Sequence, residues 1–112
     1  MHTTEKLAEK LESKIAELKV RHGVDLHLLV AADEHCIATS PSPAQYQQFK
    51  DYAADDRKRT RALEMLTRAC VVHPDPAGLE AMLGRKPGLA TSFGGKLLEL
   101  AGAVEEVEAK KL

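Results

Sequence analysis

The sequence predicts an α+β fold built from an N-terminal helix, a β-hairpin and then a small bundle of about four helices. Three observations carry this prediction. Apolar residues recur at helical spacing over residues 4–21, they alternate with their neighbours over residues 24–30, and several helical patterns follow from residue 42 onward. Because the linkers are short, we expect one domain spanning residues 1–112, with the leading helix 4–21 and the tail 103–112 able to lie at its periphery.

The leading helix is predicted from one narrow apolar face. Gly23 suits the position just after its last turn, where a left-handed backbone is common. A stripe this narrow resembles a coiled-coil seam, so the helix could pack on a partner as easily as on its own domain. The apolar residues, at spacings of 4, 4 and 3, are Leu7, Leu11, Ile15 and Leu18.

A period of two follows the first helix and predicts the β-hairpin. In the stretch VDLHLLV, the residues Val24, Leu26, Leu28 and Val30 recur at every second position and predict a strand with one buried face. The segment AADE is the expected turn, and HCIATS is the returning strand. An isolated hairpin is marginally stable in water, so it must pack on the helices or pair with another chain.

Capping residues mark the starts of the second and fourth helices. Ser42 and Gln45 fit a capping box with a proline between them. Asp75 and Pro76 repeat the cap and the proline ahead of the segment PAGLEAMLGR. Between these helices we predict a third one over residues 60–71. The expected buried residues of these three helices are Tyr46, Phe49, Ala53, Leu63, Leu66, Cys70, Leu79, Met82 and Leu83.

The last helix is predicted to begin near Leu89, after the break KPG. Its apolar pattern allows it to continue through Gly102 to Val107, where Lys110 and Lys111 would suit the negative end of its dipole. We therefore expect an apolar stripe along this helix, formed by Phe93, Leu97, Leu100 and Ala101.

Composition argues against several classes of protein. Charged residues make up 29% of the 112 residues and nearly balance to a net charge of -1, without the basic excess of a nonspecific nucleic-acid binder. The N-terminus has no apolar signal segment, and no apolar run approaches the roughly 20 residues that span a bilayer. Two cysteines are too few for a disulfide scaffold. We expect a cytoplasmic protein with reduced thiols and no membrane segment.

Catalytic and metal-binding interpretations have weak support. A zinc site could be drawn from His35, Cys36, Cys70 and His73, which offer a tetrahedral ligand count. However, adjacent residues on a strand point to opposite faces, and no CxxC spacing is present. Cys70 is expected near a helix C-terminus, which disfavours a reactive thiolate. We therefore expect no enzymatic activity, no catalytic residue, no metal and no cofactor.

Two further motifs favour packing or solvation over ligand binding. Gly94, Gly95 and Lys96 lack the spacing of a phosphate-binding loop and predict a small-residue packing notch. The best candidate for a nucleic-acid site is a basic cluster without interleaved aromatic residues and with aspartates nearby, so a solvated face is the favoured interpretation. The cluster consists of Arg57, Lys58, Arg59 and Arg61. A small nucleic-acid-associated regulator remains the alternative.

The distinctive stretch ALEMLTRACVVHPD, residues 62–75, is followed by Pro87, Gly88 and Leu89. Together with the hairpin and the capped helix, this order resembles the tail assembly chaperone-like proteins of bacteriophages and prophages over residues 10–102. Ser42 stands where that family has a basic residue. The resemblance implies a non-enzymatic cytoplasmic protein, absent from the finished virion. It implies binding to the tail tape-measure protein, which stays soluble as a result, and recruitment of tail-tube subunits.

Two apolar stripes are the candidate partner-binding surfaces. Either could cover an exposed hydrophobic stripe on a helical partner by helix-in-groove packing. Self-association through the hairpin edge or the first helix is also possible, and a protein–protein adaptor is a further alternative. The candidate residues are Leu97, Leu100, Val104 and Val107 in the last helix, and Leu7, Leu11, Ile15 and Leu18 in the first.

Overall fold

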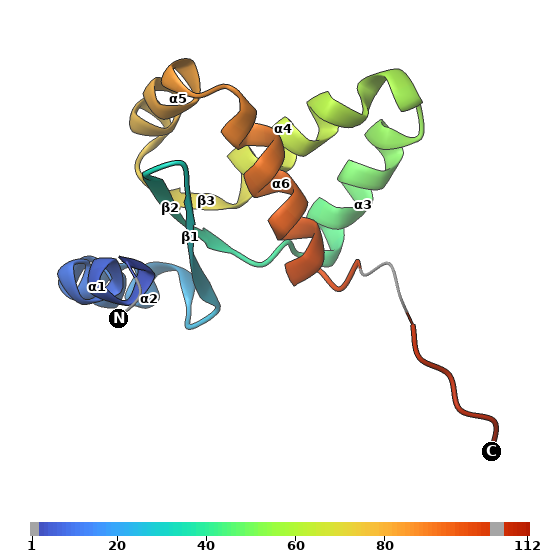
Figure 1. The fold of residues 1–112 in the computed structure, drawn as a ribbon, viewed down its shortest axis with the longest axis horizontal. Coiled ribbons are helices and arrows are strands. Elements are labelled where there is room, and N and C mark those ends of the chain that lie inside the picture. The colour runs from blue at the N-terminus through green and yellow to red at the C-terminus, as the bar shows by residue number, and fades with distance from the viewer. Residues whose placement is uncertain (1–2, 104–106) are drawn as a thin grey trace.

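Six α-helices and a three-stranded antiparallel sheet form the fold in a computed structural model, which describes residues 3–103 and 107–112 (Figure 1). The mixed architecture confirms the α+β prediction. The helices are α1 (Thr3–Lys10), α2 (Glu12–His22), α3 (Pro43–Ala53), α4 (Arg59–Cys70), α5 (Pro76–Arg85) and α6 (Gly88–Leu100). The strands are β1 (Leu26–Ala31), β2 (Glu34–Thr39) and β3 (Val71–His73), and a short 3-10 turn, η1 (Asp56–Lys58), joins α3 to α4.

The sheet lies between the α1–α2 pair and the remaining helices (Figure 1). Successive side chains of a strand point to opposite faces. On β2, Cys36 and Ala38 belong to the main core with α4 and α6. Ile37, which is 1% exposed, points to the other face, where Leu18 of α2 is 3% exposed. The sheet is therefore covered on both faces.

Because both faces of the sheet are covered, the prediction of a single buried face on the first strand is wrong. We predicted that Leu26, Leu28 and Val30 form its one buried face. The main core instead takes Leu29, which is 7% exposed, while the three predicted residues are only half-buried. Val24 is 84% exposed and precedes the strand. The hairpin itself is confirmed.

The hairpin turn is shorter than expected. Ala31 pairs directly with Glu34, so only Ala32 and Asp33 form the turn. Their φ angles of 51° and 63° are both positive, as in the type I′ turn that suits two-residue hairpins.

A third strand was not predicted. The helix predicted over residues 60–71 ends at Cys70, and the next three residues instead form β3, which pairs antiparallel with β2, with His73 opposite Ile37 and Val71 opposite Ala38. Three residues are too few to show a period of two. The bond between His73 and Pro74 is cis. As predicted, Asp75 caps α5, its Oδ1 accepting a hydrogen bond from the backbone N–H of Gly78 at 2.8 Å.

The leading helix is broken where one continuous helix was expected. α1 ends at Lys10 and α2 begins at Glu12, with Leu11 between them. No glycine or proline marks this break in the sequence. The second part ends at His22, before Gly23 with a φ of +85°, as the sequence indicated.

α4 and α6 make the closest helix contact of the core. A Cβ atom added to Gly94 of α6 would lie 2.6 Å from the backbone oxygen of Leu63 in α4, so the predicted packing notch is confirmed at Gly94. Gly95 has nothing within 4 Å of such an atom and does not contribute. Thr67, which is fully buried, places its Oγ1 2.7 Å from the carbonyl oxygen of Ala90 and 3.0 Å from that of Leu63.

The C-terminal extension of the last helix was predicted wrongly. α6 ends at Leu100, and Gly102 has a φ of +91°, which ends the helical path. Residues 107–112 have no regular secondary structure, so Lys110 and Lys111 do not face a helix end. Val104 lies outside the described residues. Among the helices of residues 3–103, none is both long and apolar enough to cross a bilayer.

Candidate functional site

A groove of about 130 Å³ lies between α3 and α4. Apart from two glutamines, its lining is apolar or aromatic. Grooves of this kind accept apolar ligands or the apolar face of a helix. We call it the α3–α4 groove. Its lining residues are Gln45, Gln48, Phe49 and Tyr52 from α3, and Ala62, Met65, Leu66 and Ala69 from α4.

One end of the α3–α4 groove is held by Gln45. Its Oε1 accepts a hydrogen bond from the backbone N–H of Ser42 at 2.9 Å, and Ser42 Oγ accepts from the Gln45 N–H at 3.1 Å. This is the capping box that the sequence predicted. In addition, Gln45 Nε2 donates to the carbonyl oxygen of Ala69 at 3.3 Å. The side chain that starts α3 therefore also ties it to the end of α4.

The α4 wall of the groove runs from the core to the solvent. Ala62 and Leu66 are 1% and 3% exposed, whereas Met65 is 46% exposed. Phe49, from α3, is 7% exposed at the base. Methionine is flexible and polarizable, and such side chains are common on surfaces that adapt to apolar partners. Sequence reasoning missed Met65, although an apolar residue beside the stripe of Leu63 and Leu66 could have indicated an exposed apolar surface.

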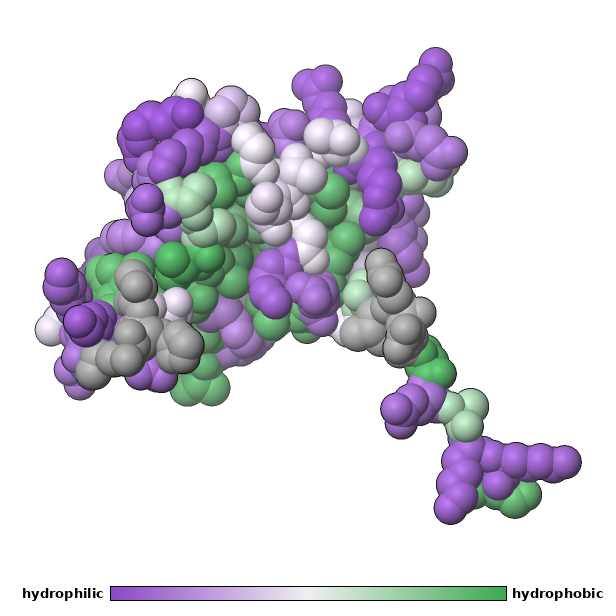
Figure 2. All heavy atoms as spheres, in the orientation of Figure 1, coloured by the Kyte–Doolittle hydropathy of each residue, from purple (hydrophilic) through white to green (hydrophobic). Residues whose placement is uncertain are grey.

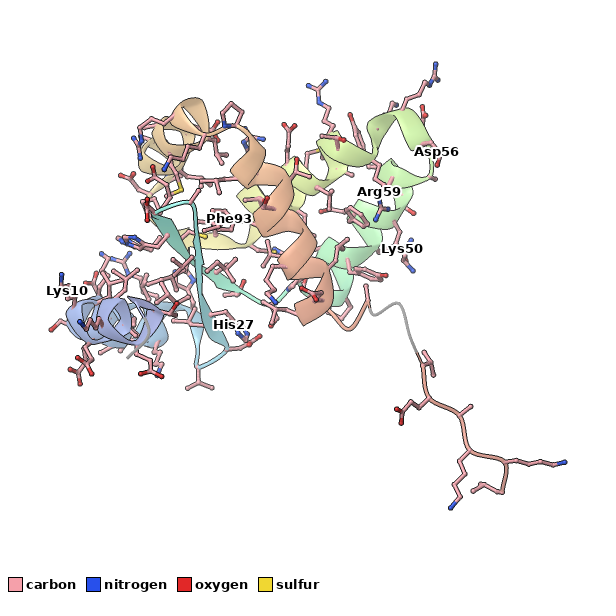
Figure 3. All side chains as sticks on the ribbon, in the orientation of Figure 1. Lys10, His27, Lys50, Asp56, Arg59 and Phe93 are labelled. Atoms are coloured by element: carbon pink, nitrogen blue, oxygen red, sulfur yellow. The ribbon has the colours of Figure 1, made fainter. Side chains whose placement is uncertain are left out.

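Basic side chains lie over the aromatic rings of α3. Lys50 Nζ is 5.2 Å from the ring centre of Tyr46, and Lys58 Nζ is 5.3 Å from that of Tyr52. Arg59 Cζ lies 5.7 Å from the ring centre of Phe49; Figure 3 labels Lys50 and Arg59 on this side of the molecule. Such contacts stabilise a cation near an aromatic face. The sequence shows no aromatic residues within the basic cluster, but the fold brings α3 to it.

The α3–α4 groove continues into a charged hollow that shares Tyr52 and Met65 with it. Two arginines of this hollow are paired. Arg57 Nε lies 3.3 Å from Oδ1 of Asp55, and the hydrogen bond from Arg57 lowers the pKa of that aspartate below its ordinary value. Arg68 contacts its glutamate partners at 2.7 and 3.8 Å. Within residues 3–103 and 107–112, Arg61 lines the hollow without such an ion pair.

The predicted partner stripe of the last helix does not form a continuous surface. Leu97 is 0% exposed and belongs to the main core, so it cannot contact a partner while the fold is intact. Leu100 is half-buried against that core, and Val107 is 83% exposed in a segment without regular structure.

The competing stripe of the first helix is also mostly covered. Leu18 is 3% exposed, and the other three residues are half-buried on the helices that cover the sheet. The half-buried residues are Leu7, Leu11 and Ile15. This stripe therefore packs largely within the chain, although sequence alone left it equally suited to a partner.

The two cysteines and two histidines considered as zinc ligands differ in how deeply they are buried. Cys36 and Cys70 are both 0% exposed, and burial raises their thiol pKa values to about 12 and about 11, so both thiols stay protonated near neutral pH. His35 and His73 are half-buried instead. The part of the chain that the structure describes contains no group of three or more histidine, cysteine, aspartate or glutamate residues placed to hold a metal.

The hairpin base carries a polar triangle that sequence reasoning did not single out. His27 Nε2 lies 2.8 Å from Asp25 Oδ1 and 3.0 Å from Ser40 Oγ, while the Ser40 hydroxyl donates to Asp25 at 3.1 Å. The hydrogen bond from His27 lowers the pKa of Asp25. In a Ser–His–Asp triad, the aspartate and the serine bind opposite ring nitrogens. Here they share one, so this arrangement differs from a triad.

The fold resembles that of a solved structure. The uncharacterised protein rbstp2171 from Bacillus stearothermophilus matches with a TM-score of 0.70 at 24% sequence identity, covering 85% of this chain and 98% of that chain. At this identity the likeness concerns the fold alone. No curated protein matches the sequence. The sequence model of DUF6848, a domain of unknown function, matches residues 31–110, and the chain therefore belongs to the DUF6848 family.

Proposed function

We propose that this protein is a non-enzymatic tail assembly chaperone of a bacteriophage or prophage. It binds the tail tape-measure protein in the bacterial cytoplasm before assembly, assists the recruitment of tail-tube subunits and is absent from the finished virion. The proposal rests on the motif order that resembles such chaperones and on one structural observation, the α3–α4 groove with the half-exposed Met65 in its wall.

The α3–α4 groove suits an amphipathic helix. Its apolar lining can take the side chains of one helical face, and Met65 can adjust to different residues along a repetitive partner. Gln45 and Gln48 stand beside the apolar floor and can hydrogen-bond to polar atoms at its edge. A long helical tape measure offers many such segments, so weak contacts can add up along it.

Charge at one end of the groove suggests the character of the bound segment. Arg57 and Arg68 are paired with carboxylates there, which leaves Arg61 as the cation of this hollow without an ion pair among the described residues. Rim charges of one sign favour partners of the opposite sign. We expect the bound helix to carry acidic residues beside its apolar stripe, and its affinity to fall as salt concentration rises.

Co-expression with the tape-measure protein tests this proposal. The wild-type chain is expected to increase the soluble fraction of the tape measure and to elute with it from a sizing column. Met65→Asp places a charge in the apolar wall and should abolish both effects. Val20→Asp is the matched control, because Val20 is 88% exposed on α2, away from the groove, and should leave binding intact.

Two results would contradict the proposal. A wild-type chain that neither elutes with the tape measure nor changes its solubility removes the chaperone function. A complex that survives Met65→Asp as well as Val20→Asp removes the groove as its site. A complex with another helical protein, sensitive only to the groove variant, would identify the protein as an adaptor instead.

A second candidate function is supported by the placement of basic side chains over aromatic rings. Lys58 beside the half-buried ring of Tyr52 resembles the mixture of cations and aromatic faces that binds single-stranded nucleic acid. A mobility shift at low salt that disappears when the four residues of the basic cluster become alanine would support a nucleic-acid-associated regulator. The absence of any shift at low salt would remove this candidate.

A further inference from the structure

β1 has a free edge. The strand order is β1-β2-β3, so β1 has a neighbour on one side only. Because the two-residue turn makes Ala31 and Glu34 a hydrogen-bonded pair, hydrogen-bonded and non-hydrogen-bonded pairs alternate from there. Leu29 therefore bonds to β2, while the backbone groups of Leu28 and Val30 point away from it.

Most of these outward backbone groups have no partner. Within residues 3–103 and 107–112, no backbone or side-chain hydrogen bond reaches the N–H groups of Leu28 and Val30 or the carbonyl oxygens of Leu26, Leu28 and Val30. The N–H of Leu26 bonds to the carbonyl oxygen of Val24 at 2.9 Å. The edge thus offers an alternating row of donors and acceptors to another strand.

A hollow of about 330 Å³ runs along this edge. Four consecutive residues of β1 line it, and consecutive side chains point to opposite faces of a sheet. A hollow that contacts all four residues therefore lies along the edge of the strand, since it reaches side chains on both faces of the sheet. Figure 2 shows hydrophobic side chains gathered over this part of the sheet, between the α1–α2 pair and α6. The hollow is lined by Leu28, Leu29, Val30, Ala31, Phe93 and Lys96, among others.

The residues of β1 itself lack the features that protect the edges of sheets, although Thr4 of α1 and Ser92, Phe93 and Lys96 of α6 flank this edge. Natural edge strands usually carry a lysine, a proline, a bulge or an inward charge. The strand LHLLVA has no charged residue and no proline, and its pairing with β2 is regular from Leu26 to Ala31. The irregularity in the sheet lies instead between β2 and β3.

We propose that β1 pairs with β1 of a second copy of this chain, antiparallel about a two-fold axis at Leu28, so that the two sheets join into one. In this register Leu28 faces Leu28 of the second copy, and Leu26 faces Val30. The central pair exchanges two backbone hydrogen bonds through its free N–H and carbonyl groups. Each flanking pair adds one, from the free N–H of Val30 to the carbonyl oxygen of Leu26.

The side chains of β1 complement themselves in the same register. On the face toward α1 and α2, leucine meets leucine and leucine meets valine, which are favourable cross-strand pairs. On the other face, His27 lies opposite Leu29 of the second copy, so no two like charges meet between the paired strands. A rotation about an axis normal to the sheet keeps its two helical layers on their own sides. This self-complementarity favours a second copy over a foreign extended peptide.

Amide hydrogen exchange measured by NMR tests the pairing without any substitution. The N–H groups of Leu29 and Ala31, which bond to β2, are expected to be protected at every protein concentration. Those of Leu28 and Val30 should become protected only as the concentration rises toward about 1 mM. Uniformly rapid exchange of Leu28 and Val30 over the whole range overturns the proposal. So does their protection at high dilution in a monomer.

Charge exchange at the two-fold axis gives a second test. Leu28→Lys and Leu28→Glu each place like charges opposite one another and should each shift the sedimentation velocity profile to that of a monomer. An equal mixture of the two variants should recover the dimer, because lysine then faces glutamate. Val20→Lys, a charge on the exposed surface of α2, should leave the dimer unchanged.

The outcomes of the second test are equally decisive. A wild-type chain that stays monomeric throughout, or a dimer that persists in both Leu28 variants, overturns pairing through β1. Protection of Leu28 and Val30 that appears only after the addition of an extended peptide would overturn self-pairing in favour of strand addition by that peptide. If the variants do not fold, the exchange pattern of the wild-type chain decides alone.

Discussion

The two sides of α4 differ in how closely they meet their neighbours. Toward α6 the backbones nearly touch, because Gly94 has no side chain and Thr67 bonds to the carbonyl oxygen of Ala90. Toward α3 the helices leave the α3–α4 groove, with Met65 half-exposed in its wall. The side of α4 that faces α6 therefore stabilises the fold, whereas the side that faces α3 stays accessible to a partner.

The largest expected effect is a difference in stability between alanine substitutions at two neighbouring residues of α4. Leu66→Ala removes a core side chain and is expected to lower the free energy of unfolding by about 2–5 kcal/mol. Met65→Ala, one residue earlier, should cost less than about 1 kcal/mol, because much of that side chain is already in water. Chemical denaturation of both variants measures the contrast. Equal losses would show that the groove wall is part of the core.

Substitutions of the two adjacent glycines of α6 test how closely α6 packs against α4. Gly94→Ala should destabilise the chain by about 1–3 kcal/mol, because the added methyl meets the backbone oxygen of Leu63, which cannot move aside like a side chain. Gly95→Ala meets nothing within 4 Å and should stabilise the helix by about 0.5–1 kcal/mol. Opposite signs in thermal unfolding support the close contact; a stable Gly94→Ala variant speaks against it.

Thr67→Val should cost about 1–2 kcal/mol, since the carbonyl oxygen of Ala90 then loses its buried donor while the shape of the side chain is nearly kept. Thr60→Val, at the exposed start of the same helix, is the control and should change stability little. Urea unfolding curves compare the two. A loss no larger than that of the control would mean that the hydroxyl does not hold α4 to α6.

The smallest expected effect lies at the turn of the hairpin. The hydrogen bond from Arg85, with further attraction from Lys86, lowers the pKa of Glu34 below its ordinary 4.5. A lowered folded-state pKa adds stability above the unfolded-state pKa, and this is lost as pH falls through the folded-state value. Glu34→Gln should therefore flatten the fall of the melting temperature between neutral and acidic pH. An unchanged slope would contradict this.

Local signals made much of the fold predictable. The caps at Ser42 and Asp75 placed α3 and α5 correctly, and the stripe of Leu63, Leu66 and Cys70 placed α4 within one residue. The features that were missed depend on tertiary contacts. β3 is too short to show a period, and the face of β1 that meets the main core depends on which helices cover each side of the sheet.

The candidate site was less predictable than the fold. Sequence reasoning sought the binding surface along the longest apolar stripes, but the longest stripes are also the ones that folding buries, as Leu97 and Leu18 show. The groove instead uses Met65, a single apolar residue beside such a stripe. Its aromatic neighbours come from α3, whereas Lys58 and Arg59 come from the turn η1 and the start of α4, so they meet only once the chain folds back after α3.

The double role of Gln45 couples the occupancy of the α3–α4 groove to the integrity of α3. One carboxamide accepts the hydrogen bond of the Ser42 amide and donates to Ala69 while lining the groove. A ligand that displaces this carboxamide must break its hydrogen bond to the Ser42 amide and so loosen the first turn of α3. Binding and helix fraying are then linked equilibria with reciprocal effects. The exchange rate of the Ser42 amide would therefore act as an internal reporter of whether the groove is filled.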